Sequence, residues 1–573
     1  MKQSIHWLAV IGCSFSFWCT SDWVVAEEQA IGPQSTPVAR EDFAHIWYVA
    51  QSTGSDSQGD GSQSKPWKSI EKALAEMPKA SAEKRSAVLV AEGKYLCNAL
   101  QLREYVELFG GFDSANWDRD IFLFQTILVS KDQCRILLGS NHARLDGFVL
   151  KGSQLRGEGA ALYCKGTSPI VTNNRFQNNQ TLAPLSWQPN YLHEKAHDGG
   201  AICALAGASP LISNNLFIEN RTEIGRGAAI AFYSHCGGVI SNNVFLGNRT
   251  GLSDQHRSSD GGAVSIFEWS KPRIENNLFI ENQALAVNDG GALFVALWSS
   301  PSIERNVFVG NKSSDDGGAL FIGGQEHRYD RPLDPLPDAE DFSILLSNNL
   351  FFGNANPKSN SGGIRMTMQS RARLVNNILG EKDQLYVQSS EVHLTNNTFL
   401  DTMTLIQFNA QLAPRLLANN IMWGKLKYEG ETPIISSNVL GGFPGKGNMN
   451  TEPFLDQDLK KLTVLSADFD SCRFVTNLQI ADADWEPNSL VGRVIESDRR
   501  WSVVKSNHAN QVVVWGNQSH VAKVNLLPTY RLQSQSPCID RGSDQHAPLT
   551  DIDGDRRPVG RSADIGADEF VPQ

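Results

Sequence analysis

Two short phrases recur along the chain at a constant separation. The first is Asn-Asn-x-Phe or a close variant, and a further Asn follows three residues after each Phe. The second is Gly-Gly-Ala or a variant of it. From the residue before each Gly-Gly phrase to the second Asn of the next pair, the steps are 16, 17, 17, 17, 17, 33 and 16 residues. A register this regular restricts the chain to architectures that repeat one structural unit.

The repeat predicts short strands with no helix between them. Apolar residues alternate with others around 263–267 and 278–282, and Gly and Asn turns separate these pieces. Such strands can bury their apolar side by coiling, so that each turn pairs in parallel with the next. Asn suits the bends because it tolerates the left-handed conformation and can bond its counterpart about 4.8 Å away in the next coil. We therefore expect an all-β parallel β-helix with the Phe column in its interior.

The domain plan follows from where the repeat begins and ends. The 573 residues would by length alone suggest three or four domains, but one coil occupies most of them. An amphipathic segment near residue 70 is expected to cap the first coils, and Gln511-Val-Val-Val-Trp515 indicates a small antiparallel β module. The predicted parts are a signal peptide (1–26), a linker (27–45), an N-terminal cap with the first coils (46–130), the repeats (131–460), the β module (461–530) and a closing segment (531–573).

The N-terminus predicts export. Lys2 precedes an apolar stretch, and small residues end it at Ala26, as in a secretory signal. We expect an exported protein in the periplasm, at the cell surface or outside the cell, with lipidation at Cys13 as an alternative. No other stretch approaches about 18 apolar residues, so no membrane span is predicted. The net charge of −11, without a basic patch, argues against a nucleic-acid partner.

Removal of the signal leaves seven cysteines, an odd number without CxxC spacing. We expect them to be small buried apolar residues rather than zinc ligands. Cys203 and Cys236 lie one repeat apart, and a disulfide between them is the alternative.

Three parts of the chain carry a family resemblance. Gly-Gly-Ala-Leu/Ile and Phe-x-x-Asn resemble the repeats of chlamydial polymorphic outer-membrane proteins and, more broadly, of right-handed parallel β-helix proteins with a pectate-lyase-like fold. Residues 47–70 and 109–113 resemble the start of exported bacterial β-helix proteins. The end, 536–570, is similar to choice-of-anchor Q segments. The resemblance implies a right-handed coil and brings no agreed activity.

The residues that precede Gly-Gly should form a column. We expect each carboxylate to accept the N–H of its own Gly-Gly turn. A calcium ion held by Asp260, Asp289 and Asp316 is the alternative, because hard oxygen ligands suit it; no other cofactor is indicated. The column comprises Glu158, Asp198, Arg226, Asp260, Asp289, Asp316 and Ser361.

Two long loops flank a short one and predict a trough for a polysaccharide. The first long loop is 180–197, and the second contains Asp254, His256, Arg257 and Asp260. The sugar-binding candidates are Trp187, Tyr191, Arg221 and Arg257. For β-elimination, calcium on Asp198 and Asp260 would neutralise a uronate while a basic side chain removes the proton. The candidate bases are Arg226, Lys195, His197 and His256. For hydrolysis, Asp198 and Asp260 would act as acid and base.

Three functions stay open. The leading hypothesis is a monomeric protein that binds polysaccharide or another cell-envelope component through its loop-bearing face. A polysaccharide lyase is the second, with a glycoside hydrolase less favoured. A structural surface or adhesion protein is the third.

Overall fold

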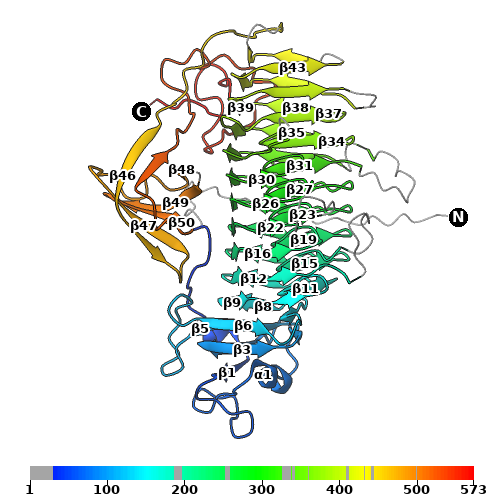
Figure 1. Cartoon of the computed structure of the whole chain (residues 1–573), viewed down its shortest axis with the longest axis vertical. Helices are drawn as coiled ribbons and strands as arrows, with labels where there is room; N and C mark the ends of the chain where they lie inside the picture. The colour runs from blue at the N-terminus through cyan, green and yellow to red at the C-terminus, as the bar shows by residue number, and fades with distance from the viewer. Residues whose placement is uncertain are drawn as a thin grey trace, which may run out of the picture.

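The computed structural model describes residues 30–185, 196–251, 259–325, 337–338, 342–358, 361–407, 412–430, 433–440, 444–498 and 500–572. Most of them form an elongated solenoid of short strands stacked along one axis (Figure 1). Its four sheets contain 14, 13, 12 and 6 strands within these ranges, and all the pairs between coils are parallel.

In the described chain, six successive coils pass through all four sheets in the same order, because the smallest sheet has only six strands. One full coil consists of β15 (Ile202–Leu205), β16 (Leu211–Ser213), β17 (Leu216–Ile218) and β18 (Arg221–Thr222). The next coil repeats it as β19 (Ile230–Tyr233), β20 (Val239–Ser241), β21 (Val244–Leu246) and β22 (Arg249–Thr250), in register residue by residue. The constant step in the sequence is therefore the path from one Gly turn through two sheets.

The two residues of each Asn pair have different tasks. The first Asn turns the chain from the 14-stranded to the 13-stranded sheet with positive φ, 54° at Asn214. The second points inward: Asn215 Nδ2 and its backbone N both donate to Asn243 Oδ1, at 3.0 and 2.9 Å. The same bonds join the second Asn of every coil from Asn174 to Asn438. A ladder of buried side-chain amides thus satisfies the hydrogen-bonding groups at the bend.

Aromatic side chains fill the interior beside this ladder. Successive Phe rings lie parallel, with centroids 4.7 to 4.9 Å apart, as predicted. The stacked residues are Phe176, Phe217, Phe245, Phe279, Phe308 and Phe351. Their strands pair directly, so one ring is added with each coil.

The N-terminal end of the core is covered by a short helix. α1 (Ile70–Glu76) begins after Ser69, whose side chain accepts the N–H of Lys72. Ile70, Ala73 and Leu74 are buried in the same cluster as the interior of the coils. Figure 1 shows α1 and β1 (His45–Val49) at one end of the stack.

Residues 460–526 form a closed antiparallel barrel beside the coils (Figure 1). Its strands are β46 (Lys460–Asp470), β47 (Val475–Ile480), β48 (Val494–Ser497), β49 (Arg500–His508), β50 (Gln511–Trp515) and β51 (Lys523–Leu526). Val503 and Trp515 of the barrel share an apolar cluster with Leu216, Leu246 and Ile280, which face outward from the 13-stranded sheet. β17, β21 and β25 (Leu278–Ile280) of this sheet are apolar at successive positions because both of their faces are buried.

The C-terminal segment lies along the flank of the last coils. Asn376 Nδ2 donates to Thr550 O at 2.8 Å, and Asn396 Nδ2 donates to Asp564 O at 2.9 Å. In an earlier coil, Asn214 Nδ2 donates to Ala30 O at 2.8 Å. In these coils the first Asn of the pair thus binds a flanking segment as well as bending the chain.

All seven cysteines of the described chain are free thiols, so the alternative of a Cys203–Cys236 disulfide is wrong. Both side chains are buried. In the part of the chain that the structure describes, no helix has the length and apolarity to cross a membrane.

Candidate functional site

The predicted acidic column forms, but its bonds run between coils. Asp198 Oδ1 accepts the N–H of Arg226 at 2.7 Å, and Asp260 Oδ1 accepts the N–H of Asp289 at 3.0 Å. Asp289 Oδ1 in turn accepts the N–H of Asp316 at 2.9 Å. The expected bond to the residue's own Gly-Gly turn is therefore replaced by a bond to the same position of the adjacent coil. The reason is that parallel stacking brings that N–H next to the carboxylate.

Cations accompany the column. Arg226 Nε lies 3.8 Å from Asp260 Oδ2, and Arg365 Nε lies 3.4 Å from Asp316 Oδ2. The side chains of Asp198, Arg226 and Asp260 are buried. These guanidinium groups offset part of the negative charge of the column, which the calcium hypothesis requires a metal ion to offset. The calcium site at Asp260, Asp289 and Asp316 stays a prediction.

Burial changes the protonation of this column. It raises the pKa of Asp198 to about 6, although Arg226 opposes the shift. Burial, together with the carboxylates of Asp260 and Asp316, raises the pKa of Asp289 well above its usual value. Both effects follow from crowding carboxylates where little water reaches them.

Of the remaining predicted residues, His197 and Arg221 are described. His197 Nδ1 lies 2.7 Å from Leu182 O, and its backbone carbonyl accepts the Thr181 hydroxyl at 2.6 Å. His197 is thus tied to the sheet, whereas the side chain of Arg221 is exposed. The other candidates lie outside the described residues: Trp187, Tyr191, Lys195, His256 and Arg257.

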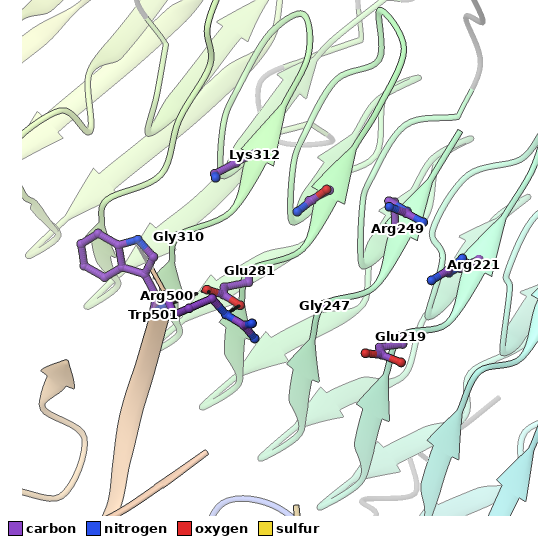
Figure 2. A pocket seen from close by; sticks show the side chains of 10 residues that line it. Glu219, Arg221, Gly247, Arg249, Glu281, Gly310, Lys312, Arg500 and Trp501 are labelled. Carbon is purple, nitrogen blue, oxygen red and sulfur yellow. Dashed lines mark hydrogen bonds and ion pairs between the residues drawn. The ribbon is translucent and has the colours of Figure 1, made fainter. Parts of the chain in front are cut away.

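Arg221 lines a groove at the corner between the 13-stranded and the 6-stranded sheets (Figure 2). The cavity there has a volume of about 340 Å³. Its wall is one repeat position seen in four successive coils, the first residue of β18, β22, β26 (Gln283–Ala284) and β30 (Lys312–Ser313). These residues are Arg221, Arg249, Gln283 and Lys312, which pair in register.

The bend before these strands forms the floor and rim. Glu219, Gly247, Glu281 and Gly310 occupy it in the same four coils, each with positive φ between 49° and 63°. Burial and the neighbouring Arg221 guanidinium lower the pKa of Arg249, while Glu219 opposes them. The positive charges of the wall are thus only partly offset by the glutamates of the rim.

The barrel closes one side of the groove. Arg500 Nε lies 3.0 Å from Glu281 Oε2, and the Trp501 N–H donates to Glu281 Oε1 at 2.8 Å. The Trp501 ring packs on Gly310 and Gly353, where a Cβ atom would lie only 2.4 and 2.1 Å from ring carbons. Trp501 also lines a second cavity of about 230 Å³, with Phe352 and Tyr530 among its walls.

A comparison with protein families identifies the architecture of the repeats. A model described as "Right handed beta helix region" matches residues 126–325. The solenoid is a right-handed parallel β-helix. The predicted fold class, all-β with an N-terminal cap and a small C-terminal β module, is confirmed.

Among solved structures, the chain is similar to XylC in complex with xylose, with 11% identity and a TM-score of 0.38 over 92% of this chain and 99% of that one. It is similar to a mutant of the PL6 family alginate lyase AlyGC, with 14% identity and a TM-score of 0.37 over 68% and 53%. The A-module of the Azotobacter vinelandii mannuronan C-5 epimerase AlgE4 has 13% identity and a TM-score of 0.27 over 64% and 91%. A search of curated protein sequences finds no match.

Sequence reasoning named Arg221 but missed the rest of the groove on this β-helix. A signal was present: Arg221, Arg249, Gln283 and Lys312 each directly follow the Asn that comes three residues after Phe. They thus share one repeat position. No comparable signal in the repeat could identify Arg500 or Trp501, because they approach from a separate part of the chain.

Proposed function

We propose that this chain is an exported protein that binds an extended polysaccharide in the groove between its β-helix and its barrel. The observation that carries the proposal is the groove's repetition. It presents one side-chain position in four successive coils, so its chemistry recurs along the axis every 4.8 Å or so. A linear polymer with a repeating unit fits such a surface better than a small compact ligand.

The composition of the groove supports the same proposal. Long polar side chains of Arg, Gln and Lys can donate to sugar hydroxyls, and the Trp501 ring offers an aromatic surface beside them. The second cavity shares Trp501, so a polymer could continue past the indole toward Tyr530. Pockets lined by aromatic rings and a few placed polar groups are typical of ligand sites.

The test is binding of a panel of neutral and acidic polysaccharides, measured by affinity electrophoresis with the parent chain and two Trp variants. We expect Trp501→Leu to weaken binding and Trp423→Leu, at a 43% exposed position outside the groove, to leave it unchanged. Thermal melting checks that both variants are folded. The proposal fails if no polysaccharide binds or if the two variants behave alike.

The same samples separate binding from cleavage. The glycan is recovered after incubation and its size is measured by chromatography. An unchanged size is expected for a binding protein, whereas shorter chains with new absorbance of an unsaturated product would establish a lyase.

A further inference from the structure

We infer that the groove selects a polyanionic polysaccharide, with carboxylate or sulfate groups held by Arg221, Arg249 and Lys312. The inference rests on the proposed function and specifies its ligand. It goes beyond the general fit of a polymer, because it predicts which glycans are excluded.

The first support is that these three cations make no close side-chain contact with a counter-charge in the described parts of the chain. No ion pair or hydrogen bond joins the side chains of Arg221, Arg249 or Lys312 to any residue that the structure describes. The contrast is Arg500 in the same groove, which Glu281 holds at 3.0 Å. Unpaired cations in a concave site retain their capacity for charge-assisted bonds to an anion.

The second support is the cost of placing like charges side by side. Arg221 and Arg249 occupy directly paired positions of β18 and β22, about 4.8 Å apart at the backbone. Like charges directly opposite each other in a sheet are destabilising. Arg249 is half-buried, and the lowered pKa that burial and Arg221 give it is consistent with this repulsion. An anion between the two guanidinium groups would relieve the repulsion.

The third support is the spacing of the charges. Gln283 lies between Arg249 and Lys312 in the register, so the cations occupy the first, second and fourth of four coils. Figure 2 shows the side chains of Arg221, Arg249 and Lys312 in one row along the coils. The row parallels the axis of the β-helix, and it would hold several anionic groups of one extended chain rather than a single ion.

The experiment compares three glycans of matched length: a polyuronate, a sulfated glycan and a neutral glucan. The proteins are the parent, the triple variant R221Q/R249Q/K312Q and the control Arg373→Gln, an exposed arginine on β35 (Arg371–Val375) outside the groove. Gln is chosen because Gln283 already occupies this repeat position. Affinities are measured by calorimetry at several salt concentrations, and melting confirms folding.

We expect at least one acidic glycan to bind the parent and the control equally, and to bind more weakly as salt rises. The triple variant should lose at least about tenfold in affinity, as expected when bonds to charged groups are removed. The relative affinities of the two acidic glycans show whether carboxylate or sulfate is preferred.

Other outcomes overturn the inference. A neutral glucan that binds as tightly as the acidic glycans, or a triple variant with unchanged affinity, would refute anion selection while leaving polysaccharide binding intact. Binding of single-stranded DNA equal to that of the glycans would show a general polyanion surface and would also refute it. If no glycan binds at all, the proposed function itself fails.

Discussion

At the scale of single residues, the two positions of an Asn pair should respond differently to the same change. Asn277 donates to Asn306 Oδ1 and accepts from Asn243, all in the buried ladder, whereas Asn276 supplies a bend with φ of 56°. Asn277→Ala leaves buried donors and acceptors unsatisfied and should lower the free energy of unfolding by about 2–5 kcal/mol. Asn276→Ala should cost only about 1–2 kcal/mol, because it strains the left-handed backbone and removes only an exposed bond from Arg305 Nε. Chemical denaturation measures both; equal costs would contradict the division of tasks.

Asp198 should make stability depend on pH. Its pKa is about 6 in the folded protein, raised by burial from 3.8. Because the folded state holds the proton more tightly, stability from this group is complete below about pH 4 and is lost as the pH rises to about 6. Asp198→Asn keeps the acceptor for the Arg226 N–H and removes the titration. The variant should therefore gain on the order of 2–3 kcal/mol over the parent between pH 4 and 7.

Denaturation at a series of pH values checks this prediction. A constant difference between Asp198→Asn and the parent would show that Asp198 has the same pKa in the folded and unfolded states, which would contradict the prediction. The same variant also bears on the lyase hypothesis, since it removes the charge that would help hold calcium.

At the scale of elements, docking of the barrel depends on the glycines beneath Trp501. Gly353 and Gly247 occupy the same bend in different coils, with φ of 65° and 62°. A Cβ at Gly353 would lie 2.1 Å from a Trp501 ring carbon, whereas the nearest atom at Gly247 is 3.9 Å away. Gly353→Ala should therefore displace Trp501 and make the barrel more sensitive to proteolysis. Gly247→Ala should lower stability only through strain of the left-handed backbone.

Tryptophan fluorescence and limited proteolysis measure the difference. Equal behaviour of the two variants would mean that Trp501 does not anchor the barrel. If Gly353→Ala also weakens glycan binding, the wall of the groove and the docking contact are the same structure.

The sequence predicts the coil well because each coil repeats the same local task. The Asn pair, the Phe and the Gly-Gly phrase each solve a bend or fill a layer, so their register carries over into the stack. The barrel contacts are different, since Glu281 and Arg500 meet across 219 residues and no periodicity connects them. The alternation expected at 278–282 is wrong for its first three residues: Leu278, Phe279 and Ile280 are all buried, because both faces of this strand are covered.

The acidic column illustrates the opposite difficulty. The sequence predicts correctly that these residues stack as a column. It does not predict the hydrogen-bond partner of each carboxylate, because that partner depends on how adjacent coils are placed against each other. The groove was missed for a related reason, because Arg249 and Lys312 look like ordinary solvated side chains until the stack aligns them.

At the scale of the whole molecule, the C-terminal segment should hold the last coils together. Arg557 is buried within it, 3.6 Å from Glu569, and donates to the carbonyls of Asp564 and Gly566. Those two carbonyls in turn accept from Asn396 in the β-helix. Arg557→Ala leaves Glu569 buried without its cation, a change that typically costs about 3–5 kcal/mol. The exposed neighbour Arg556 provides the matched control, Arg556→Ala.

Because each coil of a solenoid contacts only its neighbours, the loss should stay local. In Arg557→Ala, amide hydrogen exchange should accelerate from β35 to β41 (Leu416–Ala418), where the first Asn of each coil binds the C-terminal segment. Exchange around β16 and β20 should match the parent, since the flanking contact there comes from the N-terminal segment instead. Acceleration spread evenly over all coils would mean that the β-helix unfolds as one cooperative unit, and the C-terminal segment would then stabilise the whole stack rather than its last coils.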